Sequence, residues 1–195
     1  MLEKRLYLLA GLGNPGDIYE YTRHNAGFMI IDHIADSCSI NVNKTRFNAN
    51  YGIGRIAGEK VILVKPVAFM NRSGPPVLSI AKYFKILIKD ILIIHDDIDI
   101  ELGNLKIKKK GGDGGHKGLR SLIDSFGSRD FCRLRIGIGR PVDHFDVAAH
   151  VLRKFSSQEK KNVKQIVARA GDVVESILST GIENSMNRFN VKSNH

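Results

Sequence analysis

The chain has 195 residues, 43% of them hydrophobic, with 30 Lys and Arg against 20 Asp and Glu. This length can bury one substantial core, and no internal repeat or Pro/Ser-rich linker divides it, so we expect a single domain over residues 1–195. The formal charge of +10 favours a polyanionic partner, with nucleic acid as the leading candidate.

The cysteine count and the hydropathy pattern disfavour several other classes of protein. Cys38 and Cys132 lack metal-like or redox-like spacing, which favours a reducing compartment over a secreted disulfide scaffold. No stretch reaches the roughly 18 apolar residues of a membrane-spanning helix. The first apolar run is too short for the h-region of a signal peptide and has no cleavage signature. We therefore expect a soluble, cytoplasmic protein with no membrane partner.

Hydrophobic periodicity and turn residues predict strands and helices that alternate along the chain. The first half of the chain predicts a buried strand over 6–12, a helix over 26–37, a hairpin with strands over 51–57 and 60–65, and a helix over 73–84 capped by Ser73. A central strand over 91–94 follows, then a strand over 105–109, a helix over 118–126 and a strand over 134–138. The last predicted element is a long amphipathic helix that begins at the capping box of Ser156 and Glu159 and extends to Leu178. This order predicts an α/β fold in a single domain, with a twisted mixed β-sheet flanked by α-helices, because the hairpin breaks a strict βαβ alternation. The last helix carries a basic face, which we interpret as solvent-exposed, with anion binding as the alternative; its residues are Lys160, Lys161, Lys164 and Arg169.

The first polar cluster follows the first predicted strand directly. The turn Gly11-Leu-Gly-Asn-Pro-Gly16 lets a ligand approach the backbone closely, and Asn14, Arg23 and His24 place an amide, a cation and an imidazole beside it. The spacing also fits the G-x-G-x-x-G fingerprint of dinucleotide-binding proteins. That fingerprint requires a helix at its third glycine, whereas here a proline and a polar stretch interrupt the turn. A catalytic or substrate-binding loop is therefore favoured over a nucleotide site.

The second cluster, His95-Asp-Asp-Ile-Asp99, follows the short central strand. The carboxyl ends of strands in an α/β sheet meet at one edge, so we expect Asp96 to reach and orient His24. A neutral imidazole, whose ordinary pKa is about 6.5, can take a proton from water when a carboxylate fixes its tautomer. Water is the expected nucleophile, because no serine elbow or positioned cysteine is present. A Ca²⁺ loop is the alternative for the acids, but the pattern lacks the required glycine and has Lys108 where a bidentate Glu would sit.

Two further clusters adjoin predicted helix starts. Asn71 lies just before the helix over 73–84, where its amide and the helix N–H groups can hold a carbonyl or a developing oxyanion; an ordinary helix-start residue is the alternative. The basic run Lys106 to Lys110 leads into a glycine-rich stretch, Gly111 to Gly115, which can neutralise phosphate and move as a lid. It lacks the G-K-[ST] ending of a P-loop, so a nucleoside triphosphate site is not expected.

Together these residues resemble one family, the bacterial peptidyl-tRNA hydrolases. The motifs that carry the resemblance are Gly11-Leu-Gly-Asn-Pro-Gly16 with Tyr19 and Thr22-Arg-His-Asn25, Phe69-Met-Asn-Arg-Ser-Gly74, His95-Asp-Asp-Ile-Asp99, Gly114-Gly-His116 and Arg133-Leu-Arg-Ile-Gly-Ile-Gly-Arg-Pro141. They occur in family order, extend over most of the chain and are highly specific as a set.

The resemblance implies a monomeric α/β enzyme that hydrolyses the ester between a peptide and the terminal ribose of tRNA, and so recycles peptidyl-tRNA dropped by ribosomes. It implies no cofactor and no metal. By the same resemblance, His24 is the catalytic base that activates water, Asp96 orients it, and Lys108 and Arg135 grip a tRNA phosphate. The residues that it assigns to substrate binding are Asn14, Tyr19, Met70, Asn71, His116 and Lys117.

Two positions depart from the family pattern. Lys117 stands where the family commonly has Asn, and Ala68 stands where it commonly has Thr. The first difference concerns how the glycine-rich lid holds substrate or water, and the second is expected to alter packing. A non-catalytic RNA-binding relative is the alternative function, since plant organelle splicing factors share this fold, and a dehydrogenase is a more distant one. The retained His24 and Asp96 favour the enzyme.

Overall fold

The computed structural model describes residues 5–141 and 146–190, so the ends of the predicted 1–195 domain lie outside the described residues. The strands are β1 (Leu6–Gly11), β2 (Lys44–Arg46), β3 (Ala49–Ile56), β4 (Glu59–Pro66), β5 (Ile91–Asp97), β6 (Leu105–Lys108) and β7 (Cys132–Gly137). The α-helices are α1 (Ala26–Ser37), α2 (Gly74–Tyr83), α3 (Lys117–Phe126), α4 (Val147–Leu152), α5 (Glu159–Thr180) and α6 (Ile182–Phe189).

The described strands form one sheet in the order β2-β3-β4-β1-β5-β7-β6. The central pairs, β4 with β1, β1 with β5 and β5 with β7, are parallel. The outer pairs, β2 with β3, β3 with β4 and β6 with β7, are antiparallel. The predicted mixed α/β sheet is therefore confirmed. The parallel strands direct their carboxyl ends to one edge, where loops from β1, β4 and β5 meet.

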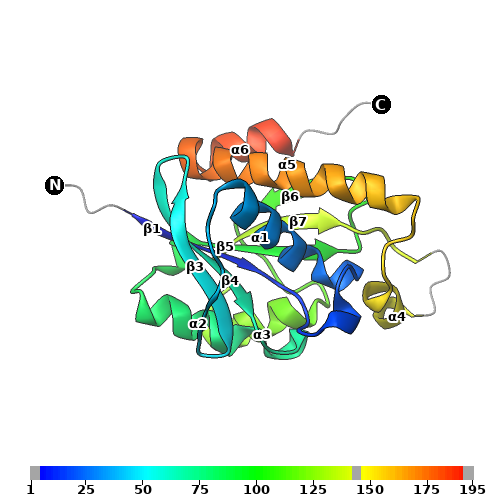
Figure 1. Cartoon of the computed structure of the whole chain (residues 1–195), viewed down its shortest axis with the longest axis horizontal. Helices are drawn as coiled ribbons and strands as arrows, with labels where there is room; N and C mark the ends of the chain where they lie inside the picture. Colours follow the sequence, from blue (N-terminus) through cyan, green and yellow to red (C-terminus); the bar gives the residue numbers. More distant parts are fainter. Residues whose placement is uncertain (1–4, 142–145, 191–195) are drawn as a thin grey trace.

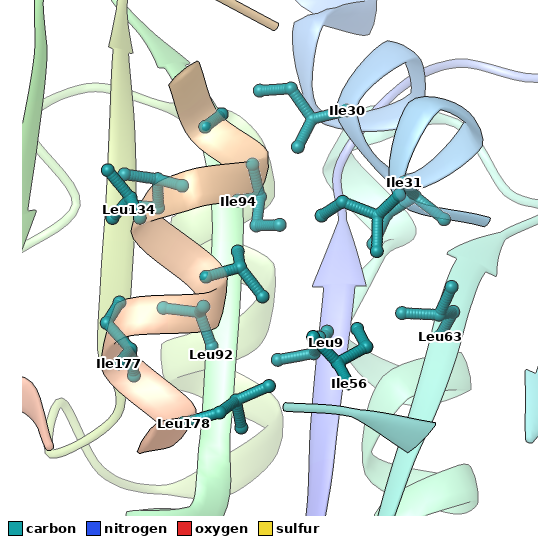
Figure 2. Close-up of a cluster of buried hydrophobic side chains, with 14 of the residues drawn as sticks. Leu9, Ile30, Ile31, Ile56, Leu63, Leu92, Ile94, Leu134, Ile177 and Leu178 are labelled. Carbon is teal, nitrogen blue, oxygen red and sulfur yellow. The ribbon is translucent and has the colours of Figure 1, made fainter. Parts of the chain in front are cut away.

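Helices cover both faces of the sheet (Figure 1): α1, α5 and α6 lie on one side, and α2 and α3 on the other. Figure 2 shows the core beneath α1 and α5, where Leu9 and Leu92 from the sheet meet Ile31 and Ile177 from the helices. The next residue on each strand faces the opposite core, because side chains alternate along a strand. Leu8, for example, packs in the core beneath α2 and α3. Burial on both faces explains why these strands read as continuous apolar runs.

A pair of glycines brings α1 against the end of β1. A Cβ atom on Gly27 would lie 2.4 Å from the carbonyl oxygen of Ile94, and one on Gly11 would lie 2.3 Å from the carbonyl oxygen of Gly27. No larger residue fits this contact without a backbone shift. The close approach places the turn before α1, which carries His24, directly beside the end of β5.

The structure also differs from the predicted elements. The strand predicted over 91–94 continues to Asp97, so the polar residues that were expected to follow it lie on the strand itself. Elements β2, α4 and α6 were not predicted. β2 is a short exposed strand and α4 buries none of its residues, so the hydrophobic period is weak in both. α6 does carry an apolar stripe, Ile182, Met186 and Phe189, which packs against the core beneath α5, so its helical spacing was a signal that the sequence reading missed.

Ser73 does not cap α2 as predicted. Its hydroxyl donates to the carbonyl oxygen of Met70 at 2.9 Å, because Ser73 continues the 3-10 turn η3 (Met70–Arg72) in helical conformation. The N–H of Gly74 donates instead to the hydroxyl of Ser121 on α3, at 2.9 Å. The capping box before α5 is confirmed: the Ser156 N–H donates to Glu159 and the Glu159 N–H donates back to the Ser156 hydroxyl.

The carboxyl end of the described chain returns to the sheet. The side-chain amide of Asn190, after α6, accepts from the N–H of Ile107 at 2.8 Å and donates to the carbonyl of the same residue at 2.9 Å. It therefore pairs with β6 as a neighbouring strand would. None of the described helices has both the length and the apolar character needed to cross a membrane.

Candidate functional site

A cleft of about 980 Å³ opens at the edge of the sheet where β1 and β5 end. Its walls come from the loop after β1, the turn η3, the glycine-rich loop before α3, and α4. All the residues to which the family resemblance assigns a role line this cleft: Asn14, Tyr19, His24, Met70, Asn71, Asp96, Lys108, His116, Lys117 and Arg135.

His24 and Asp96 form the centre of the cleft. His24 lies on the turn η2 (Arg23–Asn25), and its Nδ1 is 2.9 Å from both carboxylate oxygens of Asp96 at the end of β5. Both residues are buried. A carboxylate only accepts, so Nδ1 carries the proton and Nε2 presents a lone pair. No described residue hydrogen-bonds to this Nε2. The pair has the geometry of an oriented general base.

His116 is the second donor to Asp96. Its Nε2 lies 3.0 Å from Oδ1 of Asp96, the oxygen that also contacts His24. Its Nδ1 accepts from the N–H groups of Gly118 and Leu119, at 3.1 and 3.2 Å, and so caps the start of α3. Because Nδ1 accepts, the ring proton is on Nε2 and is donated to Asp96.

These two imidazoles also set the charge of Asp96. Burial by itself raises the pKa of the carboxyl group, because it removes water from the charged form. The electrostatic attraction and the hydrogen bonds of these two rings outweigh burial and hold the pKa of Asp96 well below its usual range. Asp96 therefore remains a carboxylate, available to stabilise an imidazolium on His24.

The same three side chains have the composition of a metal site. Among the described residues, His24, Asp96 and His116 each offer one ligand atom, and these atoms lie within 4.8 Å of one another. A metal-bound imidazole coordinates through one nitrogen and donates N–H from the other. His116 does the reverse, since its Nδ1 accepts two N–H groups and its Nε2 keeps the proton. The donor chemistry thus favours a hydrogen-bonded group over a metal site.

Asn14 is held so that it presents a donor to the cleft. Its Oδ1 accepts from the N–H of Met70 at 2.8 Å, which leaves Nδ2 as the free end of the amide. Its backbone is locked by Asn25, whose amide accepts from the Asn14 N–H and donates to the Asn14 carbonyl. The loop after β1 and the turn after β4 are therefore joined through one buried side chain.

Asn71 lies on η3 at the mouth of the cleft, immediately before α2. Its side chain is exposed. Beside it, the half-exposed ring of Phe69 packs edge-on against Tyr19, with 6.3 Å between the ring centroids. This wall of the cleft thus combines an amide with an aromatic surface.

The glycine-rich loop needs its glycines where it turns toward His116. Gly114 and Gly115 have φ of 57° and 83°, in the left-handed region that disfavours larger residues. The carboxylate of Asp113 accepts from the Gly115 N–H at 2.7 Å and closes this turn. The turn delivers His116 to Asp96 and leaves Lys117 exposed at the start of α3.

Arg133 on β7 holds the same glycine-rich loop through hydrogen bonds. The sequence analysis assigned no role to this residue. It is 2% exposed, donates to the carbonyl oxygens of Gly111 and Gly112, and stacks on the ring of Phe131. Burial lowers the pKa of its guanidinium. The sequence predicts that Arg133 and Arg135 lie on one face of a strand, because they are two residues apart. It does not predict that Arg133 binds the glycine-rich loop while Arg135 faces the cleft.

Lys108 and Arg135 are the basic residues of β6 and β7 that line the cleft, together with Arg133. Lys108 ends β6 and is exposed, whereas Arg135 on β7 is half-buried. Nε of Arg135 donates to Oδ2 of Asp97 at 2.7 Å. The two cations therefore stand in the cleft that holds His24, as the phosphate assignment requires.

The comparisons with known proteins agree on one family. The family model described as peptidyl-tRNA hydrolase matches residues 8–195. The peptidyl-tRNA hydrolase of Caldanaerobacter subterraneus subsp. tengcongensis is 46% identical, over 95% of this chain and 100% of its own. That of Clostridium novyi is 43% identical, over 95% of this chain and 98% of its own. The crystal structure of peptidyl-tRNA hydrolase from Acinetobacter baumannii has a TM-score of 0.90 at 38% identity, covering 96% of each chain.

The chain belongs to the peptidyl-tRNA hydrolase family. The resemblance carried by the sequence motifs is thereby confirmed, and the chain is an enzyme of the hydrolase class.

The structure disfavours the alternative sites weighed from the sequence. Gly16 is followed by the three-residue 3-10 turn η1 (Asp17–Tyr19) and not by the α-helix that the dinucleotide fingerprint requires. The acids at the end of β5 and just beyond it do not converge as a Ca²⁺ loop: Asp97 is paired with Arg135 and Asp99 with Arg140.

Arg23 is not in the cleft, contrary to its predicted place beside the first glycine turn. Its guanidinium turns the other way, donating to both carboxylate oxygens of Glu159 at 2.7 and 2.9 Å and to the backbone carbonyls of Arg153 and Lys154. Arg23 therefore fastens the turn that carries His24 to the segment before α5. Sequence neighbours on a 3-10 turn point in different directions, which the sequence spacing does not reveal.

His95 is a further buried residue of the site. Its Nδ1 lies 2.7 Å from the carbonyl oxygen of Asp96, so the ring donates there, and its ring meets that of His116 at 5.0 Å between centroids. Burial and the neighbouring His116 lower the pKa of His95 well below its usual value. The ring is thus a neutral packing partner. The sequence signal that could have placed His95 in the site is its position directly before Asp96.

Proposed function

We propose that this protein hydrolyses the ester that joins a peptide to the terminal ribose of tRNA, using water activated by His24. The observation that carries the proposal is the contact of His24 Nδ1 with the ionised Asp96, which leaves Nε2 as a base in a cleft lined by amide donors and cations. Family membership supports the substrate class.

In the proposed reaction, Nε2 of His24 takes a proton from water as the water oxygen attacks the ester carbonyl carbon. Asp96 stabilises the imidazolium that forms. The amides of Asn14 and Asn71 donate to the substrate, with Asn71 nearest the oxygen on which charge develops. The bond to the ribose oxygen then breaks, and His24 returns its proton to that oxygen. The products are a free peptide acid and a tRNA with a free hydroxyl.

The cations and the remaining lining residues bind the two ends of the substrate. Lys108 and Arg135 bind a tRNA phosphate, which neutralises charge and gives affinity. The peptide end contacts Tyr19 and Met70, while the peptidyl ester lies near His116 and Lys117, the residues that end the glycine-rich loop. The protein acts in this proposal as a cytoplasmic monomer without a cofactor, and it recycles peptidyl-tRNA dropped by ribosomes.

Release of peptide from purified peptidyl-tRNA tests the proposal, with aminoacyl-tRNA as the control substrate. The unmodified protein is expected to cleave the first and spare the second. His24→Ala is expected to lower kcat by about 10²–10⁴ with tRNA affinity nearly unchanged, the usual scale for loss of a general base. A variant that retained more than half of the kcat would remove His24 from the mechanism.

The phosphate assignment has a separate test. Replacing Lys108 and Arg135 together by Ala is expected to raise KM and to flatten its salt dependence, with a change of about 0.7–0.9 in the log–log slope for each lost contact. A peptidyl-nucleoside without phosphates is expected to be cleaved as before. Equal weakening with both substrates would show that these residues do not act through phosphate.

A further inference from the structure

Asp97 at the end of β5 holds Arg135 on the neighbouring strand β7. Nε of Arg135 donates to Oδ2 of Asp97 at 2.7 Å, and Oδ1 of Asp97 accepts from the N–H of Asp99 at 2.9 Å. The side chains of Asp97 and Arg135 are 13% and 23% exposed. The carboxylate is therefore fixed through both oxygens, and it fixes the guanidinium in turn.

This contact determines which edge of the guanidinium is free. The group is planar, so a hydrogen bond at Nε sets the plane in which the two Nη atoms lie. Neither Nη atom of Arg135 hydrogen-bonds to a described residue, and the same is true of Nζ of Lys108. Both side chains line the cleft. The Nη atoms of Arg135 and Nζ of Lys108 are thus available to donate hydrogen bonds to an anion in the cleft.

The surrounding strands show why orientation is needed. In the register of β6 and β7, Lys106 lies opposite Arg135 and Lys108 lies opposite Arg133, so four cations share one face. Like charges directly opposite one another destabilise a sheet and tend to push flexible side chains apart. Among the described residues, Asp97 is the carboxylate that forms an ion pair with one of these four cations, Arg135.

We propose that Asp97 is a positioning residue for substrate binding: it holds Arg135 so that its Nη donors meet a tRNA phosphate. The inference rests on the proposed function and adds to it a residue that does not touch the substrate. Without Asp97, the side chain of Arg135 must be ordered when the phosphate binds, at a cost equivalent to about 3–10-fold in affinity.

Asp97 also carries a negative charge that repels phosphate, and the experiment must separate this effect from positioning. Asp97→Asn removes the charge but keeps an oxygen that accepts from Nε of Arg135. Asp97→Ala removes the charge and the acceptor. The ratio of their KM values therefore reports positioning alone, since the loss of charge is common to both.

The two variants are compared on an N-acetylaminoacyl-tRNA and on the N-acetylaminoacyl ester of adenosine, which has no phosphate. With the tRNA substrate, KM of Asp97→Ala is expected to exceed that of Asp97→Asn by about 3–10-fold, at equal kcat. With the adenosine ester the two KM values are expected to be equal. In an Arg135→Ala background, the ratio for the tRNA substrate is expected to fall to one.

A matched pair of variants controls for loss of any ion pair. Asp32 on α1 lies 2.6 Å from Nζ of Lys65, outside the cleft, and Asp32→Asn and Asp32→Ala are expected to have equal KM values. Thermal unfolding verifies that all variants are folded.

The outcomes separate the inference from the proposed function. Equal KM values for the two Asp97 variants on tRNA, a ratio that persists without Arg135, or the same ratio on the adenosine ester would each overturn the positioning role alone. Absence of turnover by the unmodified protein on both substrates would overturn the proposed function and this inference with it.

Discussion

His116 donates from Nε2 to Oδ1 of Asp96 at 3.0 Å, while Nδ1 of the same ring caps α3. One imidazole thus ties the start of a helix to the carboxylate that orients His24. Because the two roles use different nitrogen atoms, substitution can separate them.

His116→Asn is expected to keep a capping side chain on α3 but to lose the hydrogen bond to Asp96. We expect kcat to fall by about tenfold, ~1.4 kcal/mol of barrier, with little loss of stability. His116→Ala also loses the cap and is expected to be less stable by ~1 kcal/mol. Urea unfolding and kcat measured on both variants test this. A fully active His116→Asn enzyme would contradict the role assigned to the contact with Asp96.

Asp96→Asn is expected to lower kcat by more than it changes substrate binding, because the imidazolium on His24 loses its counter-charge.

The effect of Asp96→Asn on the free energy of unfolding depends on pH. The pKa of Asp96 is depressed in the folded state, so the carboxylate stabilises the fold above the ordinary Asp pKa of about 4, and this contribution is lost as pH falls toward the folded pKa. The difference in unfolding free energy between wild type and variant should therefore shrink below about pH 4. A constant difference from pH 7 to pH 3 would argue against the depressed pKa.

Asn14 joins structure and substrate binding through opposite ends of one amide. Asn14→Asp keeps the oxygen that accepts from the Met70 N–H and loses the donor that faces the cleft, so we expect near-normal stability and reduced kcat/KM. Asn14→Ala also leaves the buried N–H of Met70 unpaired, at a cost of ~1–3 kcal/mol in unfolding free energy. Denaturant unfolding and steady-state kinetics distinguish the two effects. Wild-type kcat/KM in Asn14→Asp would remove Nδ2 from substrate binding.

Lys117 replaces the amide that the family commonly has after Gly-Gly-His. An ammonium cannot accept a hydrogen bond, but it can reach a phosphate or a peptide carbonyl. Lys117→Asn is expected to keep activity within about an order of magnitude, ~1.4 kcal/mol of barrier, and to bind tRNA somewhat more weakly at low salt. A several-hundredfold gain in kcat would instead show that the native chain is an impaired hydrolase, which favours the RNA-binding alternative.

The central strands and the long helices follow from sequence because their apolar periods are strong. The sequence also predicted that Asp96 would reach His24, since the ends of parallel strands meet at one edge, and the distance of 2.9 Å confirms it. Motif resemblance added the rest of the cleft, including Tyr19 and Arg135. These residues carry no local signal of their own.

Other features depend on tertiary contacts that a linear pattern does not encode. Arg23 adjoins His24 in sequence yet binds Glu159 on α5, because a tight turn sends neighbouring side chains apart. Ser73 has the residue type of a cap, but the preceding 3-10 turn continues through it. The sequence shows Asp97 only as one acid in a polar run. Pairing of β5 with β7 puts Arg135 opposite His95 and Asp97 opposite Gly137, and from there the Arg135 side chain reaches Asp97 diagonally.

The amide of Asn190 on β6 has a consequence for association between molecules. An edge strand exposes unpaired backbone groups to which another chain can add a strand, and such edges promote aggregation. Asn190 occupies both backbone groups of Ile107, so an incoming strand cannot use either of them. The next residue, Lys108, adds a charge at the same edge. A chain cut before Asn190 would leave the backbone groups of Ile107 open to strand addition, and the charges of Lys106 and Lys108 would then be the remaining protection of β6.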